Sequence, residues 1–87
     1  MNNFLEQEIG IVEDYFAKVG VVALKLKSDL NVGDTIHIKG HTTDLIQTVT
    51  SMQIEHQQVQ SAKSGDSVGI KVSDRVRKGD IVYKVIP

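Results

Sequence analysis

The chain has 87 residues, one proline and no cysteine, and its formal net charge is −1. This length allows a single small domain, the lack of cysteine excludes disulfides and thiolate metal sites, and the near-neutral charge gives no bulk electrostatic sign of a nucleic-acid binder. No apolar run reaches the roughly 20 residues that cross a bilayer, and residues 1–8 lack the basic and apolar regions of a signal peptide, so we expect a cytoplasmic protein without a membrane partner.

The first part of the chain predicts two strands. We expect residues 1–7 to form a flexible tail ahead of one domain that spans residues 8–87. β-Branched and aromatic residues over 8–16 favour a strand. Residues 21–27 alternate between apolar and polar positions, which predicts a half-buried strand. A helix over 13–27 is the competing prediction, but the valines and the glycine in that segment weigh against it.

Three Gly-Asp steps punctuate the rest of the chain, and each precedes an apolar run that is typical of a strand. Glycine reaches a positive φ without steric cost, and aspartate can accept hydrogen bonds from the neighbouring backbone. A metal cluster of the three aspartates is the alternative, but capping of a turn is a sufficient role for each. We therefore predict structural turns at Gly33-Asp34, Gly65-Asp66 and Gly79-Asp80.

The segment 45–55 is the longest strand candidate, and its inward face changes along its length. Val49 has the parity of Leu45, whereas Met52 has the opposite parity. A bulge near residues 50–51 would reconcile the two halves, because one extra residue resets the inside face. With this segment the chain has six predicted strands joined by short connections, which indicates an all-β fold: a small closed antiparallel β-barrel.

The apolar positions and the Gly-Asp steps together form an extended pattern: Leu30-x-Val32-Gly33-Asp34-x-Ile36-x-Ile38-x-Gly40, Val49-x-Ser51-Met52-Gln53, Ala62-x-x-Gly65-Asp66-x-Val68-Gly69-Ile70 and Gly79-Asp80-x-Val82. This pattern resembles domain 2 of the translational GTPases, the barrel of elongation factor Tu, and more closely the small translation elongation factor-like proteins. The resemblance covers about residues 8–86 and implies that barrel fold and a role in protein biosynthesis. It implies no GTPase activity, because the chain has no Gly-x-x-x-x-Gly-Lys-Ser/Thr phosphate loop.

No catalytic or metal-binding constellation emerges from the motifs. The three histidines lack ligand spacing, and we expect them at the surface: His37, His41 and His56. The serines occur in no Gly-x-Ser-x-Gly elbow, so we expect no nucleophile among them. These observations predict a protein that is not an enzyme and that has no cofactor and no metal.

The best binding candidates are basic residues near the C-terminus: Lys71, Arg75, Arg77, Lys78 and Lys84. Arginine and lysine bind phosphate groups, so this set predicts contact with tRNA or another RNA, or with a translation or RNA-modification protein. Solvated surface charges are the alternative interpretation. A second functional hypothesis is a purely protein-interaction or structural barrel that forms a homo- or hetero-oligomer through its apolar last strand.

Overall fold

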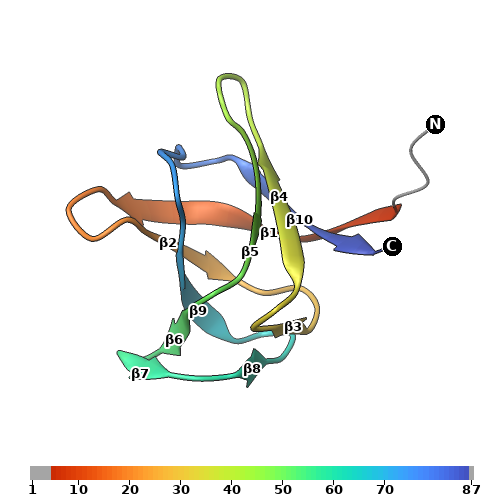
Figure 1. Ribbon diagram of the computed structural model, residues 1–87, viewed down its shortest axis with the longest axis vertical. Coiled ribbons are helices and arrows are strands. Elements are labelled where there is room, and N and C mark those ends of the chain that lie inside the picture. Colours follow the sequence, from red (N-terminus) through yellow and green to blue (C-terminus); the bar gives the residue numbers. More distant parts are fainter. Residues whose placement is uncertain (1–4, 87) are drawn as a thin grey trace.

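The computed structural model describes residues 5–86, which form ten strands and no helix (Figure 1). The strands are β1 (Leu5–Phe16), β2 (Val21–Lys25), β3 (Leu30–Asn31), β4 (Thr35–Lys39), β5 (Asp44–Thr48), β6 (Met52–Ile54), β7 (Gln57–Gln58), β8 (Ser61–Ala62), β9 (Ser67–Lys71) and β10 (Ile81–Ile86). The predicted all-β, antiparallel class is confirmed, and the competing helix over 13–27 does not form. Among the described residues, no helix is long and apolar enough to cross a membrane.

One sheet contains eight of the strands, in the order β5-β4-β10-β1-β2-β9-β6-β7, and β3 pairs separately with β8. The long strand β1 joins the two halves of this sheet, because its first part pairs with β10 and its second part with β2. Residues 5–7, predicted as part of a flexible tail, belong to β1 because they pair with β10 from Leu5↔Ile86 onward. The rest of the predicted tail, residues 1–4, lies outside the described residues.

The predicted closed six-stranded barrel is wrong in its number of strands, which is ten within residues 5–86, and in its closure, because the backbone ladder does not close. The segment 45–55 splits into β5 and β6, which lie at or near opposite ends of the sheet order. The split occurs where Val49 leaves the ladder and exchanges backbone hydrogen bonds with the turn at Gly33 and Asp34 (2.9 and 2.8 Å). The predicted change of inward face along this segment is confirmed, since Val49 and Met52 are both buried although they have opposite parity.

A side chain bridges the gap that the backbone leaves open. Gln47 on β5 donates from Nε2 to the carbonyl of Lys71 (2.9 Å), and its Oε1 accepts from the backbone N–H of Ser73 (2.8 Å). An amide side chain has the same donor and acceptor groups as a peptide unit. Gln47 therefore links the edge strand β5 to the end of β9 much as one step of a strand ladder would.

The three Gly-Asp steps form turns of one geometry. Their glycines have φ values of 100, 95 and 92°, as the third position of a type II turn requires. In each turn, the aspartate Oδ2 accepts from the backbone N–H three residues earlier at 2.8–2.9 Å, and the aspartate N–H donates to that residue's carbonyl at 3.0 Å. These aspartates cap their own turns, and residues 5–86 contain no cluster suited to a metal ion.

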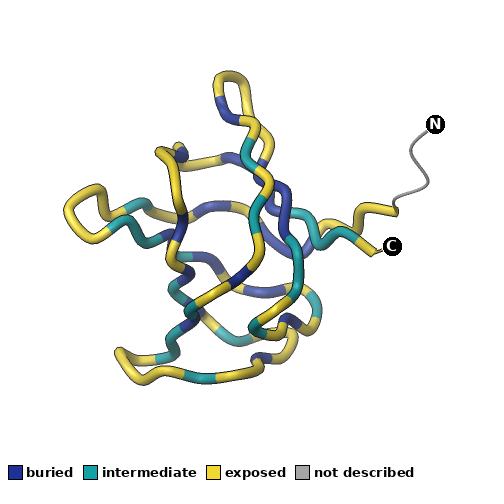
Figure 2. Tube along the Cα trace, in the orientation of Figure 1, coloured by how far each residue is buried: buried dark blue, intermediate teal, exposed yellow. Residues whose placement is uncertain are grey.

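The core lies inside the coiled sheet, and Figure 2 shows the hairpin tips mostly exposed around it. Alternation along β9 works as the sequence predicts, because Val68 and Ile70 point inward with Val72 beyond the strand end. Sixteen buried apolar residues make up this core: Ile9, Val12, Val22, Leu24, Leu26, Leu30, Ile36, Ile38, Val49, Met52, Ala62, Val68, Ile70, Val72, Val76 and Val82. The same strands turn their other face outward, and there the candidate site lies.

Candidate functional site

The five basic residues predicted as a binding surface come from β9, the loop before β10 and β10 itself. Lys71 donates to a backbone carbonyl of the β1–β2 turn, Arg77 to a hydroxyl of the β4–β5 turn, and Lys84 to a carbonyl of the β2–β3 loop. Arg75 and Lys78 are exposed in the loop before β10. The structure thus fixes three of the five side chains to three separate turns.

An apolar groove of about 690 Å³ lies on the outward face of β2 and β9. Its floor contains Val21 and Ala23 from β2 and Gly69 from β9, and Gln53 of β6 borders it. The β1–β2 and β6–β7 hairpins, which lie on the same side of the molecule in Figure 1, contribute lining residues from either side. The groove therefore runs across the outer surface of a sheet whose inner surface is core.

Small residues make the floor hollow. Ala23 and Gly69 are directly paired across β2 and β9, so two of the smallest side chains meet at one point. A Cβ on Gly69 would lie 3.1 Å from Cγ1 of Val21, which leaves no easy room for a larger residue. Phe16 and Val19, 50% and 54% exposed, stand beside this floor. A ligand that covered such apolar side chains would gain about 25 cal/mol per Å² of surface removed from water.

Two carboxylates border the groove from opposite sides. Glu13 comes from the bulge of β1 between Val12 and Asp14, and Glu55 comes from the β6–β7 turn. Within residues 5–86, neither carboxylate forms an ion pair. Both therefore remain available to a charged group that enters the groove.

The β6–β7 turn is strained. Ile54 pairs with Gln57, so Glu55 and His56 form a two-residue hairpin loop, and their φ values are 50 and 66°. Hairpin loops of this kind favour Asn-Gly, because both positions need a positive φ. For other residues the left-handed conformation costs on the order of 1–3 kcal/mol each, and such strain concentrates at functional sites.

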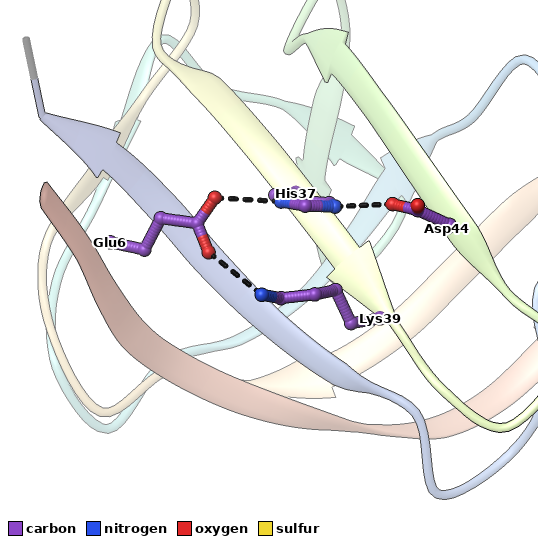
Figure 3. Close-up of polar contacts among 4 residues, drawn as sticks. All are labelled: Glu6, His37, Lys39 and Asp44. Atoms are coloured by element: carbon purple, nitrogen blue, oxygen red, sulfur yellow. Dashed lines mark hydrogen bonds and ion pairs between the residues drawn. The ribbon is translucent and has the colours of Figure 1, made fainter. Parts of the chain in front are cut away.

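A second polar cluster lies on the other half of the sheet, around His37 (Figure 3). Glu6 Oε2 lies 2.7 Å from His37 Nδ1, Asp44 Oδ1 contacts Nε2, and Lys39 Nζ lies 3.2 Å from Glu6 Oε1. A neutral imidazole has only one N–H, so carboxylates on both ring nitrogens require the charged, doubly protonated ring. Lys39 also lies over the Tyr83 ring, 5.1 Å from its centroid.

The pKa shifts in this cluster agree with that assignment. Burial of the ring lowers the pKa of His37, but the hydrogen bonds that the ring donates to Glu6 and Asp44 outweigh burial and raise the pKa above its ordinary value. The hydrogen bond from His37 is the main cause that lowers the pKa of Glu6. The expectation of a surface histidine was wrong for His37, whose side chain is 11% exposed. Sequence reasoning missed it because Glu6 approaches from β1, two strands away.

Both ring nitrogens of His37 are occupied by carboxylates, so the ring has no free position for proton transfer to a substrate. The cluster joins β1, β4 and β5 across the outer face of the sheet, and its chemistry is that of an internal clamp. The groove is the better candidate site, since its carboxylates, Glu13 and Glu55, form no ion pair within the part of the chain that the structure describes.

Comparison with known proteins gives the chain a context. No family model matches it. It is 48% identical over 77 residues to a protein of Methanocaldococcus jannaschii named an uncharacterized protease, covering 87% of this chain and 19% of that protein. It is 38% identical over 72 residues to a collagenase of Porphyromonas gingivalis, covering 80% of this chain and 20% of the collagenase. The chain thus spans about one-fifth of the length of these relatives.

Solved structures give the fold. The C-terminal domain of a U32 peptidase from Geobacillus thermoleovorans superposes with a TM-score of 0.82 at 17% identity, over 90% of this chain and 91% of that domain. Its selenomethionine variant gives 0.81 at 16% identity, over 87% and 96% of the two chains. The chain has the fold of a U32 peptidase C-terminal domain.

These findings correct four predictions. The resemblance to translation elongation factor-like proteins was wrong, and with it the roles in protein biosynthesis and RNA binding, because the relatives are named protease and collagenase. The prediction that the chain is not an enzyme is also corrected, since its relatives carry enzyme names. The Gly-Asp turns that carried the resemblance specify backbone geometry, and one β-fold can serve unrelated activities.

The alternative prediction of an oligomer formed through the last strand stays a prediction. Its strand, β10, is hydrogen-bonded to β1 on one edge and to β4 on the other. A contact through that strand would therefore have to use its outward side chains and not its backbone.

Proposed function

We propose that the chain is the counterpart of the C-terminal domain of a U32-type peptidase and that it serves such an enzyme by holding extended polypeptide in the groove on β2 and β9. The names of the relatives support the enzyme class, because a protease and a collagenase act on polypeptide chains. The sequence identity of 48% over most of this chain supports a shared domain role.

The groove is the main structural support for the proposed docking role. It is open and apolar, with a floor of small residues at Ala23 and Gly69 and exposed apolar side chains beside it. An extended peptide laid on this floor would turn every second side chain toward it. A floor on the outer face of a sheet also keeps the bound segment straight and leaves it accessible to an adjacent catalytic domain.

Binding of fluorescein-labelled denatured collagen peptides to the 87-residue protein, followed by anisotropy, tests this proposal. Ala23→Arg places a long side chain across the groove floor without touching the core, and we expect it to weaken binding at least tenfold, a change of about 1.4 kcal/mol. Ile46→Arg, at a residue 60% exposed on β5, adds the same side chain elsewhere and should bind like the wild type. Equal binding by both variants, or no binding by the wild type, would overturn the docking role.

A further inference from the structure

We infer that the groove selects extended segments in which an apolar side chain is accompanied by a lysine or an arginine. This inference rests on the proposed function of the groove as a polypeptide site, and it adds the class of segment that the site prefers. Three features of the described residues carry it: the length of the hollow surface, the position of the carboxylates, and the strained turn.

The hollow surface continues beyond the apolar floor. A second hollow, of about 640 Å³, is lined by Ile11, Lys25 and Gly65 among others, and it shares Glu13 with the first. The two hollows therefore follow one another along the outer side of β1 and β2. The seven residues from Val21 to Lys27 span roughly 20 Å at the rise of a strand, which suits an extended peptide better than a compact ligand.

Acidic and basic side chains line different parts of the two hollows. Glu13 lies where the two hollows meet, and Glu55 lies on the far side of the floor, beyond β6. Lys18 lies in the β1–β2 turn, at one end of the floor. Lys25 and Lys27 line the second hollow, where Lys27 is paired with Glu8. A cationic side chain beside the apolar floor would thus have a carboxylate on either side, neither of them engaged by another ion pair within residues 5–86.

The turn that presents Glu55 gives an independent argument. Both Glu55 and His56 adopt positive φ, where Asn-Gly would fit without strain. A strained pair that borders a groove indicates that these side chains serve the site and not the turn. The carboxylate of Glu55 is the group that attraction to a lysine or an arginine would use.

The test compares three labelled octapeptides that differ only at two positions, with the cores Leu-Thr-Lys, Leu-Thr-Glu and Ser-Thr-Lys. Positions two apart point to the same side of an extended chain, so the apolar and charged groups reach the groove together. We expect Leu-Thr-Lys to bind most tightly at low salt. Leu-Thr-Glu should bind about threefold to fivefold more weakly, as for a partly exposed ion pair, and the difference should shrink with added salt.

Matched variants assign the preference to the two carboxylates. Glu13→Gln/Glu55→Gln should bind Leu-Thr-Lys and Leu-Thr-Glu with nearly equal affinity and still reject Ser-Thr-Lys. Asp29→Asn/Asp74→Asn changes the net charge by the same amount at exposed loop positions and should keep the wild-type preference.

The outcomes separate this inference from the proposed function. If none of the octapeptides and none of the collagen peptides bind, the groove is not a polypeptide site and both proposals fail. If the octapeptides bind with equal affinity for lysine and glutamate, or with a preference for glutamate, the docking role stands and the cationic preference is wrong. If the control variant loses the preference as well, net charge and not the groove accounts for it, and the inference is again wrong.

Discussion

The two outward faces of the sheet differ in whether their charged side chains form ion pairs. On the face of β4, β5 and β10, His37 lies between Glu6 and Asp44, and Lys39 is bonded to Glu6 and covers an aromatic ring. On the face of β2 and β9, Glu13 borders an apolar groove without an ion pair among the described residues. The first face pairs its charges internally, and the second leaves the carboxylates of Glu13 and Glu55 without an ion pair among the described residues.

This difference indicates which face is prepared for a ligand. A charge that already has an opposite partner offers little to an incoming group, because binding would have to break the existing pair. A carboxylate beside an apolar floor keeps its hydration until a ligand arrives, and it then contributes attraction where the apolar contact excludes water. Strain follows the same division, since Glu55 and His56, the non-glycine residues with positive φ within 5–86, both lie at the groove.

The largest expected effect is on stability, and it distinguishes the core face of β9 from its groove face. Ile70 and Ser67 belong to one strand, but Ile70 is 1% exposed and Ser67 faces the groove. Ile70→Asp buries an unpaired charge, which costs several kcal/mol in a domain whose total stability is of that order. We expect Ile70→Asp to abolish cooperative thermal unfolding followed by circular dichroism.

Ser67→Asp is the matched control in the same strand. Its added carboxylate faces the groove and water, so the transition should stay within a few degrees of the wild type. A cooperative transition for Ile70→Asp near that of the wild type would show that the inward face of β9 is assigned incorrectly.

The sequence predicts the backbone of this domain better than its surface. Alternation along β4 and β9 and the repeated Gly-Asp steps are local signals, because they depend on residues adjacent in the chain. They give the strands, the turns and most of the core. Closure was predicted incorrectly because it depends on one long-range event, the departure of Val49 from the ladder toward the turn at Gly33.

The groove and the His37 cluster could not be predicted, because both arise from pairing between distant strands. Ala23 and Gly69 meet only through the register of β2 and β9, and each alone is an ordinary small residue in a strand. His37 contacts Glu6, which lies 31 residues earlier in the chain. One local signal existed at the groove: Glu55-His56 between two short strand-forming runs departs from the usual chemistry of a two-residue hairpin.

The next prediction tests whether the strain at the groove serves binding. Glu55→Asn/His56→Gly supplies the residues that a turn with two positive φ values favours. We expect the free energy of unfolding to rise by about 1–3 kcal/mol as the strain is relieved. Anisotropy should show weaker binding of the Leu-Thr-Lys peptide, because the Glu55 carboxylate is lost.

Opposite changes in stability and binding are the decisive feature of that variant. His41→Gly, in the exposed β4–β5 turn, is a control that changes a histidine to glycine away from the groove. Stabilisation without loss of binding would mean that the Glu55-His56 pair is merely tolerated, and the comparison between the two faces would then rest on charge alone.

A smaller effect, with a pH signature, is expected on the paired face. His37→Gln removes the charged hydrogen bonds to Glu6 and Asp44, and we expect it to cost about 1–2 kcal/mol near pH 5.5. Because the folded state raises the pKa of His37, its contribution is complete below the ordinary histidine value of about 6.5 and is lost as pH rises through the raised value. Because the pKa of Glu6 is lowered, the contribution of that carboxylate is lost as pH falls through its own folded value.

The difference in melting temperature between wild type and His37→Gln should therefore be largest near pH 5.5 and smaller at pH 9 and at pH 3. A difference that grew toward pH 9 would contradict a charged His37. Peptide binding in the groove should be unchanged by this variant, because the cluster lies on the other face.

The smallest effect concerns Gln47, whose side chain links β5 to the end of β9. Gln47→Ala removes the bonds to the Lys71 carbonyl and the Ser73 N–H, and we expect a loss of about 1 kcal/mol, because both groups can turn to water at this exposed site. Hydrogen exchange gives the sharper measurement: the Ser73 amide should exchange faster in the variant, while the exchange rate of the Ile70 amide in the ladder of β9 should not change.

Gln47→Glu is the matched second variant, because it keeps an acceptor for Ser73 but loses the donor to Lys71. It should restore protection at Ser73 alone. If Ser73 exchanged equally in all three proteins, Gln47 would not hold β5 to the end of β9, and the floor of the groove would depend on the β2–β9 ladder without help from β5.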